Sequence, residues 1–147
     1  MIKKIPIFLI IFLYGCGYSA VYKNDESINY NIIISEMTGD IRMNKLIKNE
    51  LEIHSSESSE NNYIVKLDTS YLKQIKTKNS SGIASNYEII VVANFKINSQ
   101  TITFEERFIV KNMSDSLEQR NYEGIIQKNF ASSIKDKLII RLFNLKW

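Results

Sequence analysis

Three segments between residues 63 and 110 alternate apolar and polar residues, and this alternation constrains the fold more than any other feature. A period of two is typical of a β-strand with one buried face. The segments therefore predict three antiparallel strands in a meander. Their inward positions are Tyr63, Val65, Leu67, Thr69 and Tyr71; Tyr87, Ile89, Val91, Ala93, Phe95 and Ile97; and Ile102, Phe104, Phe108 and Val110, interrupted by Glu106.

The apolar residues also suggest how these strands pair, because partners in a hairpin share one face of the sheet. A turn at Ser99–Gln100 satisfies this condition for the second and third segments, and a turn near Gly82 predicts two favourable charge pairs between the first and second. The first turn sets Ile97 opposite Ile102, Phe95 opposite Phe104, Val91 opposite Phe108, Ile89 opposite Val110 and Ala93 opposite Glu106. The second sets Asp68 opposite Lys96 and Lys76 opposite Glu88.

Further elements are predicted on either side of the meander. Alternation at Ile28, Tyr30, Ile32 and Ile34 indicates a strand, and Asp40 can cap the helix that follows it. The apolar face of that helix is Met43, Leu46, Ile47 and Leu51. The last helix carries Tyr122, Ile126, Phe130, Ile134, Leu138 and Leu142 at four-residue intervals, and Ile125 and Ala131 widen the stripe. The order β-α-β-β-β-α predicts an α+β two-layer sandwich, with a mostly antiparallel four-stranded sheet and two helices, as a single domain over residues 28–147.

The N-terminal residues have the features of a lipoprotein signal. Lys3 and Lys4 precede an apolar run, Ile5–Leu13, and Leu13-Tyr14-Gly15 leads to Cys16, the only cysteine. A charged start, a short apolar stretch and a small residue before the cut are what export and cleavage require. We expect residues 1–15 to be the signal peptide, Cys16 to carry the lipid and residues 16–27 to be a tether. An uncleaved transmembrane anchor is the alternative, but nine apolar residues are far fewer than the roughly 20 that span a bilayer.

Composition and charge narrow the functional classes. Removing Lys3 and Lys4 from the 19 basic residues leaves 17 against 16 acidic residues, so the mature chain is close to neutral and a nucleic-acid partner is not expected. The single histidine, His54, lies in a polar loop, and Glu105 and Glu106 should point to opposite faces of a strand. We expect no enzymatic activity, no cofactor and no metal site.

Three lysines form a candidate binding site. Lys73, Lys76 and Lys78 lie toward the tip of the first hairpin, beside Tyr71 and Leu72. Cations next to apolar surface suit a phosphorylated amphiphile such as lipopolysaccharide. The alternative is a solvated, charged edge that resists aggregation.

The chain resembles the LPS-assembly lipoprotein LptE family in its alphaproteobacterial form. The resemblance lies in Cys16-Gly17-Tyr18 followed by Val21-Tyr22, in the turn Gly82-Ile83-Ala84-Ser85-Asn86-Tyr87, and in the closing run 121–142. Asn86 replaces the usual arginine of that turn, and Ile125, Ile126, Ser132 and Ser133 replace the usual alanines of the last helix.

The resemblance implies a non-enzymatic lipoprotein of the outer membrane, anchored by lipid on the periplasmic side. Members of this family plug the LptD β-barrel, help it to assemble and can bind lipopolysaccharide during its transport. The alternative is a structural lipoprotein of another envelope complex, such as a barrel-assembly or secretin-pilot subunit.

Overall fold

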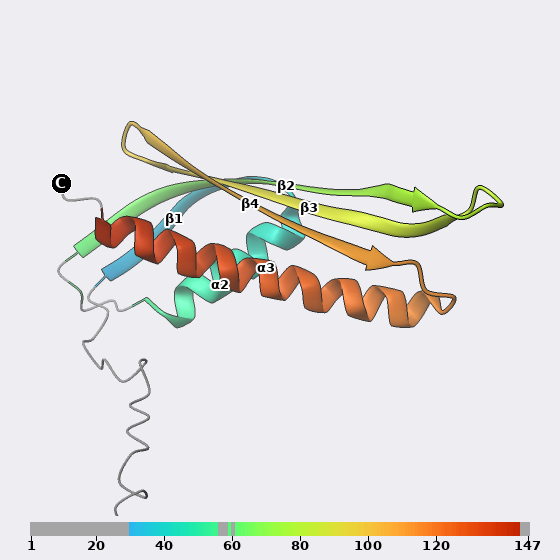
Figure 1. Cartoon of the computed structure of the whole chain (residues 1–147). Coiled ribbons are helices and arrows are strands. Elements are labelled where there is room, and N and C mark those ends of the chain that lie inside the picture. The colour runs from blue at the N-terminus through green and yellow to red at the C-terminus, as the bar shows by residue number, and fades with distance from the viewer. Residues whose placement is uncertain (1–29, 56–58, 60, 145–147) are drawn as a thin grey trace, which may run out of the picture.

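The computed structural model describes residues 30–55, 59 and 61–144 and confirms the predicted α+β fold (Figure 1). The predicted signal peptide, Cys16 and the tether lie outside these residues. None of the described helices is long and apolar enough to cross a membrane. The elements are β1 (Tyr30–Gly39), α2 (Ile41–Ile53), β2 (Asn61–Lys78), β3 (Ala84–Ile97), β4 (Gln100–Lys111) and α3 (Ser116–Asn144).

The four strands form one sheet in the order β1-β2-β3-β4, and both helices cover the same face (Figure 1). β1 and β2 are parallel, so α2 serves as the crossover between them, while the other pairs are antiparallel. Beneath the sheet, α2 and α3 pack against each other. The inner face and the helices enclose the core, in which Phe95 is among the largest fully buried side chains.

The predicted register between β3 and β4 is wrong by two residues, although the predicted face is right. The loop is Asn98–Ser99, closed by Ile97 opposite Gln100, and Asn98 has φ 54°. Asparagine tolerates this left-handed conformation, so the chain turns earlier than expected. Because a shift of two keeps every side chain on the same face, the apolar pattern could not detect it. The observed pairs include Phe95–Ile102, Ala93–Phe104, Val91–Glu106, Ile89–Phe108 and Tyr87–Val110.

The register between β2 and β3 also differs by two residues from the prediction. Asp68 lies opposite Asn94, whose Nδ2 donates to Asp68 Oδ2 at 3.2 Å, and the predicted partner Lys96 lies opposite Lys66. The ion pair between Lys76 and Glu88 nevertheless forms at 3.0 Å, although Gln74 is the residue opposite Glu88. Irregular pairing after Ile75 accompanies this diagonal contact. The predicted register was therefore wrong, whereas the predicted ion pair between Lys76 and Glu88 is confirmed.

The first helix begins and packs as predicted. The carboxylate of Asp40 accepts a hydrogen bond from the backbone N–H of Met43 at 2.7 Å, which satisfies one of the unpaired donors at the helix start. Met43, Ile47 and Leu51 are buried, and Leu46 is partly buried against the same cluster.

The last helix buries most of its predicted stripe, but not Tyr122. Four residues advance an α-helix about 40° beyond one turn, so a strict four-residue stripe rotates around the axis. The residues from Ile126 onward stay covered because α3 contacts both β4 and α2, whereas Tyr122 is 37% exposed and Ile125 54% exposed. The buried apolar residues of α3 are Ile126, Phe130, Ala131, Ile134, Leu138 and Leu142.

Candidate functional site

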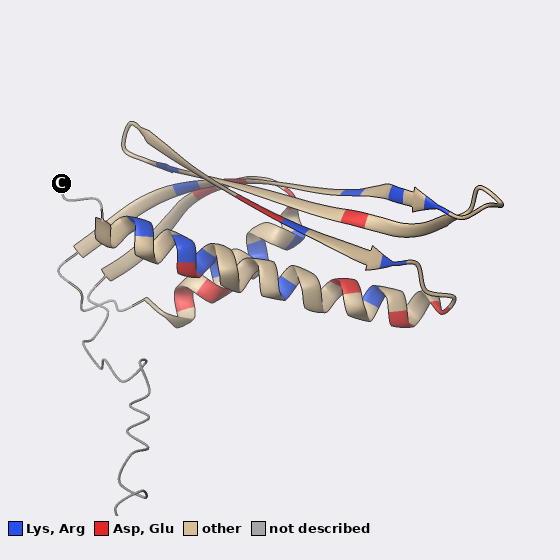
Figure 2. Ribbon diagram, in the orientation of Figure 1, with Lys and Arg blue, Asp and Glu red and all other residues tan. Residues whose placement is uncertain are grey.

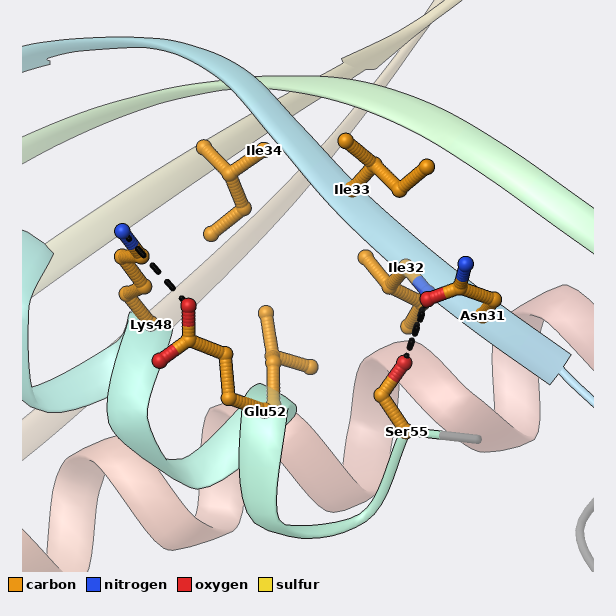
Figure 3. Close-up of a pocket in the computed structure, with 8 residues that line it drawn as sticks. Asn31, Ile32, Ile33, Ile34, Lys48, Glu52 and Ser55 are labelled. Atoms are coloured by element: carbon orange, nitrogen blue, oxygen red, sulfur yellow. Dashed lines mark hydrogen bonds and ion pairs between the residues drawn. The ribbon is translucent and has the colours of Figure 1, made fainter. Parts of the chain in front are cut away.

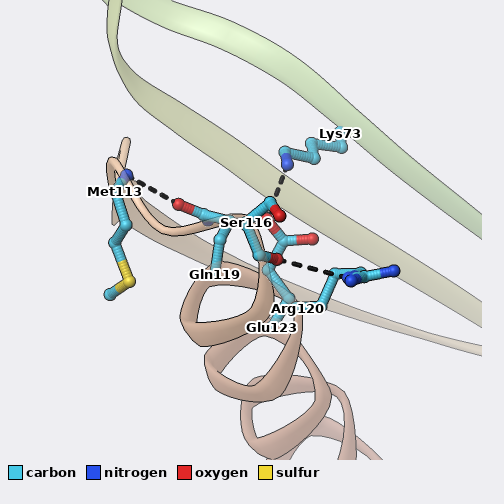
Figure 4. Close-up of polar contacts among 6 residues, drawn as sticks. All are labelled: Lys73, Met113, Ser116, Gln119, Arg120 and Glu123. Atoms are coloured by element: carbon cyan, nitrogen blue, oxygen red, sulfur yellow. Dashed lines mark hydrogen bonds and ion pairs between the residues drawn. The ribbon is translucent and has the colours of Figure 1, made fainter.

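Lys73 lies on the helix-covered face of β2 and is bound to α3. Its Nζ lies 2.6 Å from Glu123 Oε1 and 4.4 Å from the ring centroid of Tyr87, and its side chain is 31% exposed (Figure 4). Gln119 donates to the same carboxylate oxygen at 2.6 Å and accepts a hydrogen bond from the backbone N–H of Met113 at 2.8 Å. This contact network fastens the start of α3 to the sheet, so the charge of Lys73 has a structural partner.

Burial shapes the protonation of Tyr71 beside this contact network. Burial raises the pKa of the Tyr71 phenol, and the negative charge of Glu123 raises it further. A hydrogen bond with Gln127 and the positive charge of Lys73 act in the opposite direction. The net effect is a pKa of the Tyr71 phenol above its usual value.

Lys76 reaches the opposite face of the sheet. Its partner Glu88 lies between Tyr87 and Ile89 in sequence, and alternation turns it away from the helices. Glu88 accepts hydrogen bonds from Gln74 at 2.9 Å and from Lys76 at 3.0 Å, and these bonds lower the pKa of its carboxyl group. Its side chain is only 8% exposed, whereas that of Lys76 is 46% exposed.

Lys78 ends β2 at the tip of the hairpin and forms no ion pair with any residue of the described segments. The tip itself is ordered by Asn79, whose Oδ1 accepts from the backbone N–H groups of Ser81 and Ile83 at 3.0 and 2.9 Å. The structure thus separates the three candidate lysines. Lys73 points to α3, Lys76 pairs with Glu88 on the opposite face of the sheet, and Lys78 lies at the tip of the hairpin.

Sequence reasoning missed the role of Glu106, the carboxylate that interrupts the apolar face of β4. It lies opposite Val91 on the inner face and accepts from Ser133 Oγ at 2.7 Å and from Lys137 Nζ at 2.5 Å. It therefore joins β4 to α3. A charge at an inward position of a strand was the available signal, because such a group needs a polar partner.

Exposed apolar side chains occur on most elements of the domain. Among the described residues, fifteen large hydrophobic side chains are exposed, and they occur on β1, α2, β2, β4 and α3 and in the loop before β3. Charges of both signs are interspersed along the sheet and the helices (Figure 2). The exposed residues are Ile33, Met37, Ile41, Ile53, Ile64, Leu72, Ile75, Ile83, Phe108, Ile109, Leu117, Tyr122, Ile125, Ile140 and Phe143.

Within residues 30–55, 59 and 61–144, no three histidine, cysteine, aspartate or glutamate side chains form a group that could hold a metal ion. His54, at the end of α2, is exposed, and its Nδ1 lies 2.9 Å from the carbonyl oxygen of Glu50.

The fold occurs in solved bacterial lipoproteins. The rare lipoprotein B of Shewanella oneidensis superposes with a TM-score of 0.57 at 14% identity, over 78% of this chain and 92% of that chain. A lipoprotein of Caulobacter crescentus CB15 superposes with a TM-score of 0.52 at 12% identity, over 79% of this chain and 88% of that chain. No family model and no curated protein matches the sequence. At these identities the likeness shows a shared fold.

Proposed function

We propose that this chain is a lipoprotein of the outer membrane, anchored through Cys16 on the periplasmic side. It plugs an LptD-type β-barrel, helps that barrel to assemble and takes part in delivering lipopolysaccharide to the outer leaflet. The resemblance of its sequence to the LptE family supports this proposal, as does a fold shared with two solved lipoproteins. The role is one of binding and assembly and includes no catalytic step.

The distribution of exposed apolar residues is the observation that carries the barrel partnership. Contiguous exposed apolar surface marks sites of interaction, and Ile33 and Ile64, which pair directly between β1 and β2, are both exposed. Here the exposed residues occur on five of the six elements, from Ile33 on β1 to Phe143 near the end of α3. One flat partner could cover only one side of the domain. A partner that encloses the domain can cover the exposed apolar residues on all of its sides. Large obligate interfaces are likewise rich in apolar residues.

The tip of the β2–β3 hairpin is the proposed lipopolysaccharide contact. Ile75 and Ile83 are 51% and 60% exposed there, beside Lys76 and Lys78. This combination offers cations for phosphate groups and apolar surface for the attached lipid. Of the three candidate lysines, Lys73 contributes least to such a site, because it points to α3 and its side chain is 31% exposed, against 46% for Lys76.

Neutralising the tip lysines should separate ligand binding from barrel binding. We expect Lys76→Gln combined with Lys78→Gln to reduce lipopolysaccharide retention at least tenfold, because two cations that face the phosphates are lost. Capture of the barrel should be unchanged, since that interface is spread over the domain. Both assays use one purified variant, and circular dichroism verifies its fold.

A matched variant controls for the change in net charge. Lys128→Gln combined with Arg141→Gln removes two exposed cations from α3 and should leave lipopolysaccharide retention as it was. Equal retention by both double variants and the unmodified chain would show that Lys76 and Lys78 are only a solvated edge. Loss of barrel capture with a native spectrum would assign the tip to barrel docking instead.

A further inference from the structure

We propose that the outer edge of β1 is a docking site for an extended polypeptide strand, which adds to the sheet beside β1. β1 is the edge strand of the described sheet, and α2 runs beneath it. Between the two lies a groove, here called the β1 groove, of about 640 Å³ (Figure 3). Its lining residues are Asn31, Ile32, Ile33, Ile34, Lys48, Leu51, Glu52 and Ser55. This inference does not depend on the proposed barrel partner.

The backbone of β1 directs hydrogen-bonding groups into the β1 groove. The N–H of Ile32 points away from β2, because it donates to Ser55 Oγ at 3.2 Å. Ser55 in turn donates to Asn31 Oδ1 at 2.8 Å. In a strand, the N–H groups of alternate residues point to the same side, so that of Ile34, the last paired residue before the register shift, also faces the groove. The Ser55 hydroxyl thus accepts one of the backbone hydrogen bonds that an added strand would otherwise accept from the edge of β1.

The shape and lining of the groove suit a side chain of such a strand. Ile34 and Leu51 supply apolar surface, and Lys48 and Glu52 pair across it at 3.5 Å with side chains 41% and 59% exposed. An exposed pair of this kind contributes little to stability and can rearrange easily. A second hollow of about 420 Å³ adjoins the first, since Lys48 and Glu52 line both. It continues along α2 to Met37, which is 44% exposed, and Ile41, which is 85% exposed.

The two edges of the sheet differ in how they resist strand addition. β4, at the other edge, carries the consecutive charged residues Glu105, Glu106 and Arg107 at its centre, and such charges protect an edge. β1 carries its one charged residue, Glu36, beyond the register shift that follows Ile34, and the three consecutive residues before that shift, Ile32–Ile34, are all isoleucine. Only an extended polypeptide returns both a donor and an acceptor to each outward-facing residue, which identifies the class of occupant.

A second copy of this chain fits the β1 groove less well. Symmetric antiparallel pairing centred on Ile34 would bring the two α2 helices side by side. Because Ile34 and Lys48 line the same part of the groove, Lys48 of one copy would meet Lys48 of the other. Like charges in that position oppose pairing. The occupant is therefore a strand from another polypeptide, with apolar side chains at every second position.

The test uses the full-length chain in detergent and a labelled probe peptide that copies Asn61–Asp68. This segment already pairs in parallel with the opposite edge of β1, so its backbone is compatible with β1. We expect Ile34→Pro to weaken peptide binding at least tenfold, measured by fluorescence anisotropy. Proline removes the outward N–H of Ile34 but no hydrogen bond to β2, and edge strands tolerate it. Ile34→Ala shortens the same side chain but keeps the N–H, so Ile34→Pro should bind the peptide at least tenfold more weakly than Ile34→Ala does.

Further variants keep the test decisive if Ile34→Pro fails to fold. Lys48→Trp should fill the groove from an exposed position and abolish binding, whereas Lys128→Trp on α3 should not. Two further peptides carry N-methyl groups on alternate backbone amides, one at the N–H groups that would face β1 and the other at those that would face away. Only the first should bind more weakly than the parent peptide. Failure of the parent peptide to bind, equal binding by Lys48→Trp and Lys128→Trp, or equal binding of all three peptides would overturn the proposal. A chain that dimerises without peptide, with the dimer lost in Lys48→Trp, would assign the edge to a second copy.

Discussion

Replacing Gly39 by alanine should prevent the domain from folding. Gly39 ends β1 with φ +86°, a conformation that side chains disfavour, and a Cβ there would lie 1.8 Å from the carbonyl oxygen of Thr69. The same oxygen accepts from the backbone N–H of Asp40 at 2.9 Å, and Thr69 Oγ1 donates to Asn44 Oδ1 at 2.9 Å. Thr69 therefore cannot move away from the added Cβ without breaking these hydrogen bonds, which join β2 to the start of α2. We expect a loss larger than the roughly 3–5 kcal/mol of a large-to-small core substitution.

Gly82 provides the matched control for this prediction. It has φ +77°, and an added Cβ would meet nothing within 4 Å. Gly82→Ala should cost only the strain of the left-handed conformation, about 1–2 kcal/mol. Urea unfolding followed by circular dichroism compares the two variants. Similar stabilities for Gly39→Ala and Gly82→Ala would mean that the contact with Thr69 does not limit the fold.

Replacing Cys16 by alanine should abolish lipid attachment completely. Cys16 is the only cysteine, so no other thiol can accept the lipid. Metabolic labelling with a palmitate analogue should mark the unmodified chain and leave the variant unlabelled, as an unprocessed or soluble periplasmic protein. Ser19→Ala serves as the control and should be labelled normally. Retained label in Cys16→Ala would contradict the lipoprotein interpretation of the N-terminal residues.

The alternating pattern predicted the strands and their buried faces, and the reason it missed the register is physical. Alternation has a period of two, so it cannot distinguish registers that differ by two residues. The turn decides between them, and here Asn98 adopts φ 54°. The parallel pairing of β1 with β2 was also beyond the pattern, because alternation says nothing of strand direction or order.

The candidate lysines illustrate a different limit. The sequence places Lys73, Lys76 and Lys78 close together, but alternation and the irregular pairing after Ile75 send Lys73 and Lys76 to different faces. Glu123 is fifty residues away from Lys73 in the chain, so their ion pair depends on how α3 packs. The spread of exposed apolar residues is likewise visible only in the folded chain, since Tyr122 belongs to the predicted buried stripe and is 37% exposed.

The most direct test of the proposed function is purification of the LptD-type barrel from the cells that make this chain. The barrel carries the affinity tag, and the amount of this chain retained after detergent washing is measured by quantitative mass spectrometry. An obligate plug predicts retention at close to one copy per barrel, because the exposed apolar surface is covered only in the complex. Absence of the chain from the purified barrel, together with its recovery on another envelope complex, would contradict the proposed function.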